Sequence, residues 1–196
     1  WHVSNLFYQE PQLELARRIL AESHHGKIFF CNSGAEANEA AIKLARRYMR
    51  KVRKQDAYEI ITLSSCFHGR TFGALAATGR ESLSDGFTPL PEGFCQVEAG
   101  NLAALEAAIG PQTAAVMLEV VQGEGGVFPL PADYLQGVER LCRAKGILLI
   151  CDEVQAGLCR TGKFWAYQNF GLTPDIISCA KALANGLPMG AMLATD

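Results

Sequence analysis

The sequence predicts an α/β fold in which helices flank a mostly parallel sheet. Two apolar runs, residues 147–151 and 176–180, are partly β-branched and too short for ordinary helices. Runs of this kind are typical of strands that are buried on both faces of a parallel sheet. A helical segment lies between the two runs, so that both strands can run in the same direction.

Strands and helices alternate along the rest of the chain. After an irregular lead-in over residues 1–10, Ser33 and Glu36 form a capping box that predicts the start of a helix beside Gly34. Residues 80–100 are rich in glycine and proline, which indicates a long connection. The predicted strands cover residues 28–31, 58–63, 114–121, 147–152 and 175–181, and the other helices cover 11–23, 73–78, 102–109, 132–145 and 165–170.

The composition restricts the class of protein. Hydrophobic residues make up 49% of the 196 residues and charged residues 19%, which allows a sizeable core. The net charge of −2 gives no reason to expect nucleic acid or a membrane surface as a partner, and no apolar run is long enough for a membrane span. The seven cysteines are scattered and form no C-x-x-C pair, which indicates the cytoplasm or another reducing compartment and predicts no metal site.

Asp152 and Lys181 each follow one of the two apolar runs. Ligands of open α/β sheets bind at the carboxyl ends of the strands, so we expect both side chains to face one pocket. A lysine in a desolvated pocket can present a free amine to a carbonyl, and a buried carboxylate needs a cationic partner. A pyridinium ring that carries an aldehyde would satisfy both groups. The simpler alternatives are a buried ion pair or two solvated loop residues.

Three further positions suggest a binding site. The helix that begins beside Gly34 would present free backbone N–H groups to a phosphate, although a capping box also occurs without a ligand. Phe67 could stack on a planar ring or simply pack in the core. Arg70 could hold a carboxylate in a bidentate fork or form a surface ion pair.

With residues 32–41, 67–79, 119–126 and 152–190 taken together, the sequence resembles the subgroup III aminotransferases. These are fold-type I enzymes that depend on pyridoxal 5′-phosphate, and the resemblance covers essentially the whole chain. It implies that residues 1–196 are an incomplete large, cofactor-binding domain without the C-terminal small domain. It also implies that the full-length protein is a homodimer whose active site is completed across the interface.

The resemblance assigns two catalytic residues. Lys181 matches the Schiff-base lysine, which also moves the proton, and Asp152 matches the acid that pairs with the pyridine nitrogen. The other residues expected to contact the cofactor are Gly34 and Ala35 at the phosphate, Phe67 and Val154 on the two faces of the ring, and Gln155 near the phenolic oxygen.

The resemblance also assigns substrate contacts. Arg70 matches the residue that binds a substrate carboxylate, and Glu124 resembles a glutamate that moves aside for 2-oxoglutarate. The chain departs from the family pattern at Ala182 and Cys159, where glycines are usual, and at Val120, where a proline is usual.

The implied reaction belongs to arginine biosynthesis. It moves the terminal amino group of N-acetylornithine to 2-oxoglutarate and gives N-acetylglutamate semialdehyde and glutamate. Ornithine, succinylornithine or 4-aminobutyrate are alternative donors, and a non-catalytic remnant that acts as a structural or interaction domain is an alternative from another class.

Overall fold

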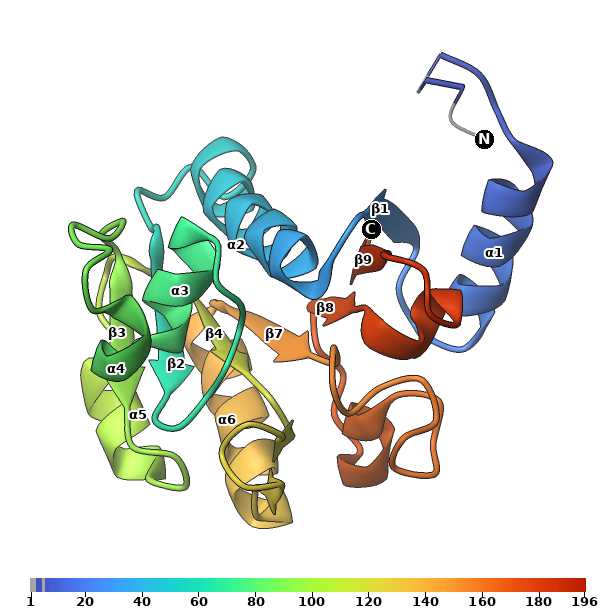
Figure 1. Cartoon of the computed structure of the whole chain (residues 1–196). Helices are drawn as coiled ribbons and strands as arrows, with labels where there is room; N and C mark the ends of the chain where they lie inside the picture. Colours follow the sequence, from blue (N-terminus) through green and yellow to red (C-terminus); the bar gives the residue numbers. More distant parts are fainter. Residues whose placement is uncertain (1–2, 5) are drawn as a thin grey trace.

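A central sheet organises the molecule (Figure 1). The computed structural model describes residues 3, 4 and 6–196, so Trp1, His2 and Asn5 of the predicted lead-in lie outside the described residues. Within this part of the chain, seven strands form the sheet in the order β1-β9-β8-β7-β4-β2-β3. The strands are β1 (Lys27–Cys31), β2 (Glu59–Leu63), β3 (Phe94–Val97), β4 (Thr113–Leu118), β7 (Leu148–Asp152), β8 (Ile176–Cys179) and β9 (Gly190–Ala194).

Helices cover both faces of this sheet (Figure 1). Ile150 and Met117 point to the face covered by α2 and pack with its apolar side chains. Leu149 and Val116 point to the opposite face and pack with residues of α5 and α6, as the alternation of side chains along a strand requires. The helices are α1 (Glu10–Ala21), α2 (Gly34–Lys51), α3 (Phe72–Thr78), α4 (Glu81–Ser84), α5 (Leu102–Ala108) and α6 (Ala132–Lys145), with the short 3-10 helices η1 (Ala166–Phe170) and η2 (Lys181–Ala184).

The sheet is parallel except for β9. Strand β7 pairs in parallel with β4 and β8, and β2 pairs in parallel with β3 and β4. Strand β9 runs antiparallel between β8 and β1. The predicted α/β fold with a mostly parallel sheet between helices is therefore confirmed. Because β7 and β8 run in the same direction, the sites that follow them lie at the same edge of the sheet.

The structure corrects the prediction in several places. Strand β9 was not predicted, and the strand expected over residues 175–181 ends at Cys179. The expected connection over residues 80–100 contains α4 and the edge strand β3, which pairs only with β2 and is too short to give a clear periodicity. Strand β4 ends at Leu118, and the next residues form a hairpin of β5 (Val121–Gln122) and β6 (Phe128–Pro129) in place of a plain loop. The helix expected around Trp165 is the five-residue η1. None of the described helices is both long and apolar enough to span a membrane.

The loop that follows β7 is held by a buried acid. Glu153 is 1% exposed, and its carboxylate accepts hydrogen bonds from the backbone N–H groups of Ala166 and Tyr167, both at 2.8 Å. These bonds fix the first turn of η1 against the sheet. Burial raises the pKa of Glu153 to about 7, although the two N–H donors oppose this change.

The raised pKa of Glu153 predicts a pH-dependent stability. The folded chain keeps a proton on Glu153 up to about pH 7, whereas the unfolded chain releases it near 4.5. The free energy of unfolding should therefore fall as the pH rises between these values, by on the order of 3 kcal/mol from this group. We expect Glu153→Gln to flatten this dependence in urea unfolding at pH 5 and pH 7.5. If the free energy of unfolding changes equally with pH in Glu153→Gln and in the unchanged protein, the assignment is wrong. The exposed Glu106→Gln is the control and should keep the pH dependence of the unchanged protein.

Candidate active site

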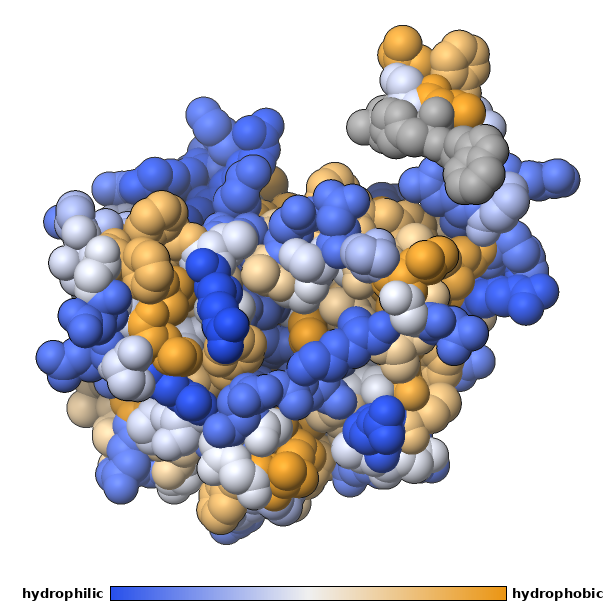
Figure 2. Space-filling model, in the orientation of Figure 1, coloured by the Kyte–Doolittle hydropathy of each residue, from blue (hydrophilic) through white to orange (hydrophobic). Residues whose placement is uncertain are grey.

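A cavity of 520 Å³ lies beside the carboxyl ends of β7 and β8 and the first turn of α2. Its size is within the range of small-molecule sites. Figure 2 shows a hollow on this face of the molecule, bordered by both hydrophilic and hydrophobic residues. The cavity is lined by eight residues that the sequence predicted for one site, Gly34, Ala35, Phe67, Arg70, Asp152, Val154, Gln155 and Lys181.

Asp152 is the buried acid of this cavity, with 3% of its surface exposed. Its Oδ2 accepts hydrogen bonds from Asn38 Nδ2 and from His68 Nδ1, both at 2.8 Å. Its Oδ1 accepts one from the backbone N–H of Val154 at 2.9 Å, and the hydroxyl oxygen of Ser178 lies 3.4 Å from it. A carboxylate offers about four lone-pair sites. The single proton of the Ser178 hydroxyl is donated to Asn38 Oδ1 at 2.5 Å, so Asp152 Oδ1 retains capacity for one further donor.

His68 is the cationic neighbour of Asp152. Its side chain is fully buried, and the Nδ1 to Oδ2 contact forms an ion pair when the imidazole is protonated. Burial lowers the pKa of His68, but Cys66 and the Asp152 carboxylate raise it more, so that the net pKa lies well above the usual value. His68 was not among the site residues predicted from the sequence, and the structure shows that its imidazole is a hydrogen-bond partner of the central acid.

Glu119 adds a second buried carboxyl group near Asp152. It is 3% exposed, directly follows β4 and accepts the backbone N–H of Phe67 at 3.0 Å. Burial and the neighbouring Asp152 raise the pKa of Glu119 to about 7, while His68 and the Phe67 N–H oppose this rise. The site thus combines two buried carboxyl groups with one imidazole, and of the two acids Asp152 is the one that lines the cavity.

The start of α2 forms another wall of the cavity. Ser33 is the N-cap, and its Oγ accepts the backbone N–H of Glu36 at 3.1 Å. The first N–H groups of a helix have no partner within the helix, which leaves those of Gly34 and Ala35 available to an anion. The predicted capping box is only half correct, because Glu36 accepts from the backbone and side chain of Asn32, at 2.8 and 2.9 Å, and not from the Ser33 N–H.

Gly34 permits a close approach between α2 and the segment after β7. A Cβ atom at this position would lie 2.7 Å from Val154 Cγ1 and 3.1 Å from Cγ2. Such distances are too short for any ordinary packing contact. Glycine at this position therefore allows the close approach of Val154, and both residues line the cavity.

Lys181 begins η2, directly beyond β8, and lines the cavity together with Asp152. Its backbone has a φ of +49°, in the left-handed region that non-glycine residues rarely adopt. The prediction of a desolvated lysine is wrong for the described chain, because its side chain is exposed. Lys181 also lines an adjoining cavity of 490 Å³ that it shares with Gln155 and Arg160.

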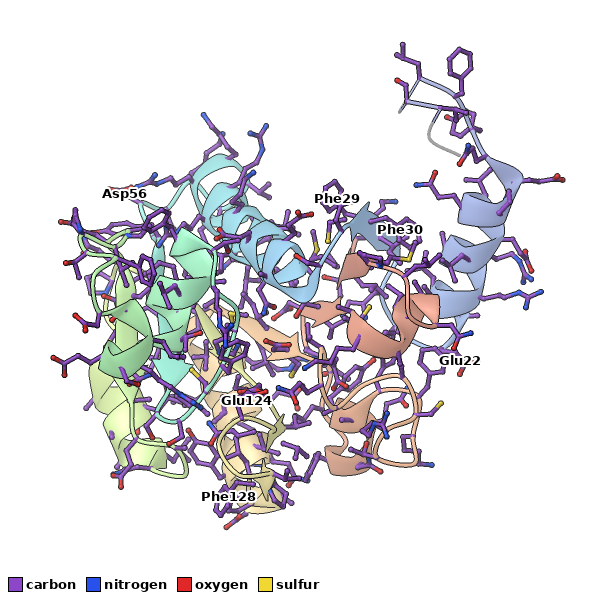
Figure 3. All side chains as sticks on the ribbon, viewed as in Figure 1. Glu22, Phe29, Phe30, Asp56, Glu124 and Phe128 are labelled. Atoms are coloured by element: carbon purple, nitrogen blue, oxygen red, sulfur yellow. The ribbon has the colours of Figure 1, made fainter. Side chains whose placement is uncertain are left out.

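Of the two predicted substrate contacts, Arg70 lines the cavity and Glu124 does not. Arg70 is exposed, and its guanidinium carbon lies 5.8 Å from the centre of the Phe67 ring, a cation–π distance. Glu124 lies on the turn between β5 and β6 (Figure 3) and does not line the cavity. Its Oε1 accepts a hydrogen bond from Gln155 Nε2 at 3.2 Å, so Glu124 reaches the site through Gln155.

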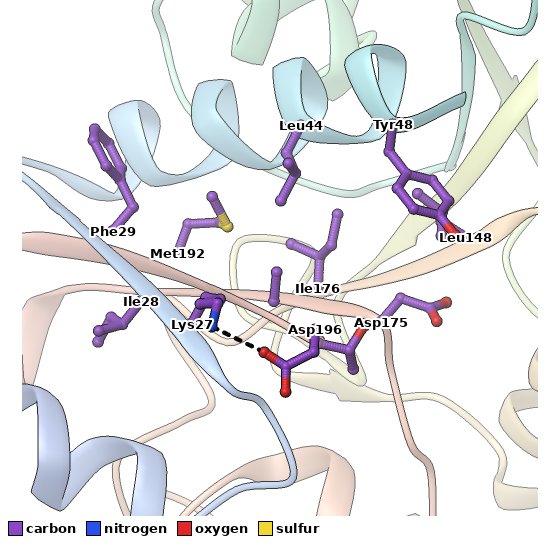
Figure 4. A pocket seen from close by; sticks show the side chains of 12 residues that line it. Lys27, Ile28, Phe29, Leu44, Tyr48, Leu148, Asp175, Ile176, Met192 and Asp196 are labelled. Atoms are coloured by element: carbon purple, nitrogen blue, oxygen red, sulfur yellow. Dashed lines mark ion pairs between the residues drawn. The ribbon is translucent and has the colours of Figure 1, made fainter. Parts of the chain in front are cut away.

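A separate cavity of 320 Å³ lies between α2 and the β1, β8 and β9 side of the sheet (Figure 4). Its walls are mostly apolar side chains, among them Leu44, Ile176 and Met192. The ion pair of Lys27 and Asp196, 3.1 Å apart, lies at its rim. None of the predicted site residues lines this cavity.

The fold and the site correspond to a known class of protein. The chain belongs to the aminotransferase class-III family, whose model matches residues 1–196. It is 50% identical to an acetylornithine aminotransferase of Myxococcus xanthus over 196 residues, which are 100% of this chain and 49% of that protein. The chain thus spans about half the length of the curated relatives it matches.

Solved structures of the same class share this fold. An ornithine aminotransferase from Toxoplasma gondii, with partial occupancy of PLP at its active site, superimposes with a TM-score of 0.94 at 32% identity, over 99% of this chain and 47% of that chain. An N-acetylornithine aminotransferase from Stenotrophomonas maltophilia superimposes with a TM-score of 0.84 at 39% identity, over 100% of this chain and 49% of that chain. The predicted fold of a PLP-dependent aminotransferase is confirmed.

The cavity has the chemical groups that pyridoxal phosphate requires. The first N–H groups of α2 suit its phosphate. The buried Asp152 carboxylate, with capacity for one more donor, suits a protonated ring nitrogen. The amine of Lys181, which lines the same cavity, suits its aldehyde.

The contact between Gly34 and Val154 can be tested by a double-mutant cycle. We expect Gly34→Ala to lower the free energy of unfolding by about 1–3 kcal/mol, because the added methyl group overpacks against Val154. In a Val154→Ala background the same substitution should be neutral or stabilising, since alanine favours helix formation over glycine. Urea unfolding of the four proteins measures the coupling. Equal effects of Gly34→Ala in both backgrounds would contradict the contact.

Proposed function

We propose that this protein is an aminotransferase that uses pyridoxal phosphate and that residues 1–196 form most of its large domain. One observation carries the proposal: a buried acid, Asp152, and an amine, Lys181, line one cavity beside the start of α2. In the proposed complex, PLP supplies an aldehyde for imine formation and a ring that withdraws electrons from the substrate. The family membership of the chain and the names of its relatives support this assignment.

Each lining residue has a defined task in the proposal. The Asp152 carboxylate holds the proton of the ring nitrogen, and the N–H groups of Gly34 and Ala35 bind the phosphate. Val154 and Phe67 contact the two faces of the ring. Gln155, which Glu124 already holds through a hydrogen bond, donates to the phenolic oxygen.

Lys181 performs the covalent and proton-transfer chemistry of the proposal. It is the lysine that lines the cavity, and its position directly beyond β8 brings its amine to the same edge as Asp152. In its free-base form, Nζ can take the proton from the substrate carbon that bears the transferred amino group.

We infer that the protein of natural length transfers the terminal amino group of N-acetylornithine to 2-oxoglutarate. The acetylornithine aminotransferase from Myxococcus xanthus supports this donor. Arg70, exposed at the cavity entrance and stacked on Phe67, supplies the guanidinium for a substrate carboxylate. Ornithine is the main alternative donor, because the ornithine aminotransferase from Toxoplasma gondii has the same fold. Succinylornithine and 4-aminobutyrate are further alternatives among the amine donors.

The proposal also includes a homodimer in the cytoplasm. Phe72 and Leu187 are exposed apolar side chains that a second copy could cover, and Leu187 lines the cavity. All seven cysteines are free thiols, as expected in a reducing compartment.

The role of Lys181 can be tested by chemical trapping. Borohydride reduction of the PLP-loaded protein should attach the cofactor covalently to the peptide that contains Lys181, as measured by mass spectrometry. We expect Lys181→Ala to abolish this labelling and the violet absorbance of the bound cofactor, because among the described residues no other lysine lines the cavity. The exposed Lys163→Ala is the matched control and should label normally. Undiminished labelling of the Lys181→Ala protein would reject the assignment.

The substrate assignment can be tested with single half-reactions. With N-acetylornithine, ornithine, succinylornithine and 4-aminobutyrate as donors, we expect N-acetylornithine to give the highest kcat/KM. Arg70→Gln should raise the KM for the donor by about tenfold or more, because it removes a charged hydrogen bond to the carboxylate. The exposed Arg47→Gln on α2 should leave the KM unchanged.

The alternative of a non-catalytic domain makes an opposite prediction. A protein of natural length that stays colourless with pyridoxal phosphate and forms no dimer would support a structural or interaction domain. Size-exclusion chromatography and the absorbance of the same sample distinguish the aminotransferase from the non-catalytic domain.

A further inference from the structure

Asn38 is a buried residue at the centre of the site, and no role was predicted for it from the sequence. It lies on α2 and is 1% exposed. Its Nδ2 donates hydrogen bonds to Asp152 Oδ2 at 2.8 Å and to the backbone oxygen of His68 at 2.7 Å. Its Oδ1 accepts one from Ser178 Oγ at 2.5 Å. One amide therefore connects α2 with β7, with β8 and with the segment that carries Phe67 and Arg70.

The partners of Asn38 determine the orientation of its amide. The ionised Asp152 carboxylate and the His68 carbonyl can only accept hydrogen bonds, so the NH₂ group must face both of them. The hydroxyl of Ser178 then donates to the remaining oxygen. A flipped amide would place its oxygen against two acceptors, at a considerable cost in this buried position.

This amide in turn fixes the plane of the Asp152 carboxylate. Asn38 and His68 both donate to Oδ2, and the backbone N–H of Val154 donates to Oδ1 at 2.9 Å. With these three donors in place the side chain has one orientation, and the free acceptor capacity is on Oδ1. A group that is fixed in advance loses little conformational freedom when it binds its partner.

We propose that Asn38 is a positioning residue that orients Asp152 toward the ring nitrogen of pyridoxal phosphate. The inference rests on the proposed function, because it requires Asp152 to contact that nitrogen. A purely structural Asn38 would stabilise the packing of α2 on the sheet without affecting recognition of the nitrogen. The two roles differ in how they affect ligands with and without a ring nitrogen.

The experiment compares two ligands in the protein of natural length. The first is pyridoxal phosphate, and the second is its carbocyclic analogue, in which a C–H group replaces the ring nitrogen while the aldehyde and phosphate remain. The Kd ratio of the two ligands measures recognition of the nitrogen alone. We expect the unchanged protein to prefer pyridoxal phosphate, and Asn38→Leu to reduce this preference by about tenfold or more, as for the loss of a hydrogen bond to a charged group.

Two further variants complete the design. Ser178→Ala removes the hydroxyl that holds the Asn38 oxygen, and should reduce the preference to a smaller extent. Gln122→Leu is the matched control, because Gln122 is also a buried amide, donates to the Ser64 carbonyl at 2.8 Å and has no bond to Asp152. It should lower stability and leave the Kd ratio unchanged.

The outcomes separate this inference from the proposed function. If Asn38→Leu and Ser178→Ala keep the ratio of the unchanged protein, or weaken both ligands equally, Asn38 is only structural and the inference is wrong. If the unchanged protein itself binds both ligands equally, Asp152 does not contact the ring nitrogen and the proposed cofactor geometry fails as well. Should Asn38→Leu not fold, the Kd ratio of Ser178→Ala decides alone.

Discussion

The buried carboxylate of Asp152 constrains the arrangement of the site. A carboxylate with 3% exposure is stable as an anion only if donors replace the water it has lost. Those donors come from α2 through Asn38, from the segment after β2 through His68, and from the backbone after β7 at Val154. Any structure that satisfies Asp152 must therefore bring these three segments together, and in doing so it assembles the walls of the cavity.

The acceptor capacity that remains on Asp152 Oδ1 suits a cationic N–H donor. Asp152 and Glu119 are two buried acids, and burial raises the pKa of Glu119 to about 7. His68 compensates for part of this negative charge, because its pKa is raised well above the usual value. The opposite requirement applies at the start of α2, where free N–H groups favour an anion. A ligand with a cationic ring and an anionic phosphate would match both ends of the cavity.

The sequence patterns were most informative where an element is long or buried on both faces. The helix over residues 132–145 was predicted correctly from its apolar periodicity. The strands β7 and β8 were predicted from continuous apolar runs, although β8 ends at Cys179 and not at Lys181. The edge strand β3 and the hairpin of β5 and β6 were not predicted, because two to four residues give too little periodicity. Cys159, which replaces a usual glycine, has a φ of +67°, so the backbone keeps the left-handed conformation that the family pattern implies.

The sequence by itself determined the fold class, the family and which residues should share a site, because local patterns and motif spacing carry this information. Only the tertiary structure decided that Asn38, Ser178 and His68 surround Asp152, since these contacts join positions up to 140 residues apart. It also decided that Lys181 is exposed and that Glu124 reaches the cavity through Gln155. The physical reason is that burial and hydrogen bonding depend on which segments pack together, and no local pattern in the chain specifies those long-range neighbours.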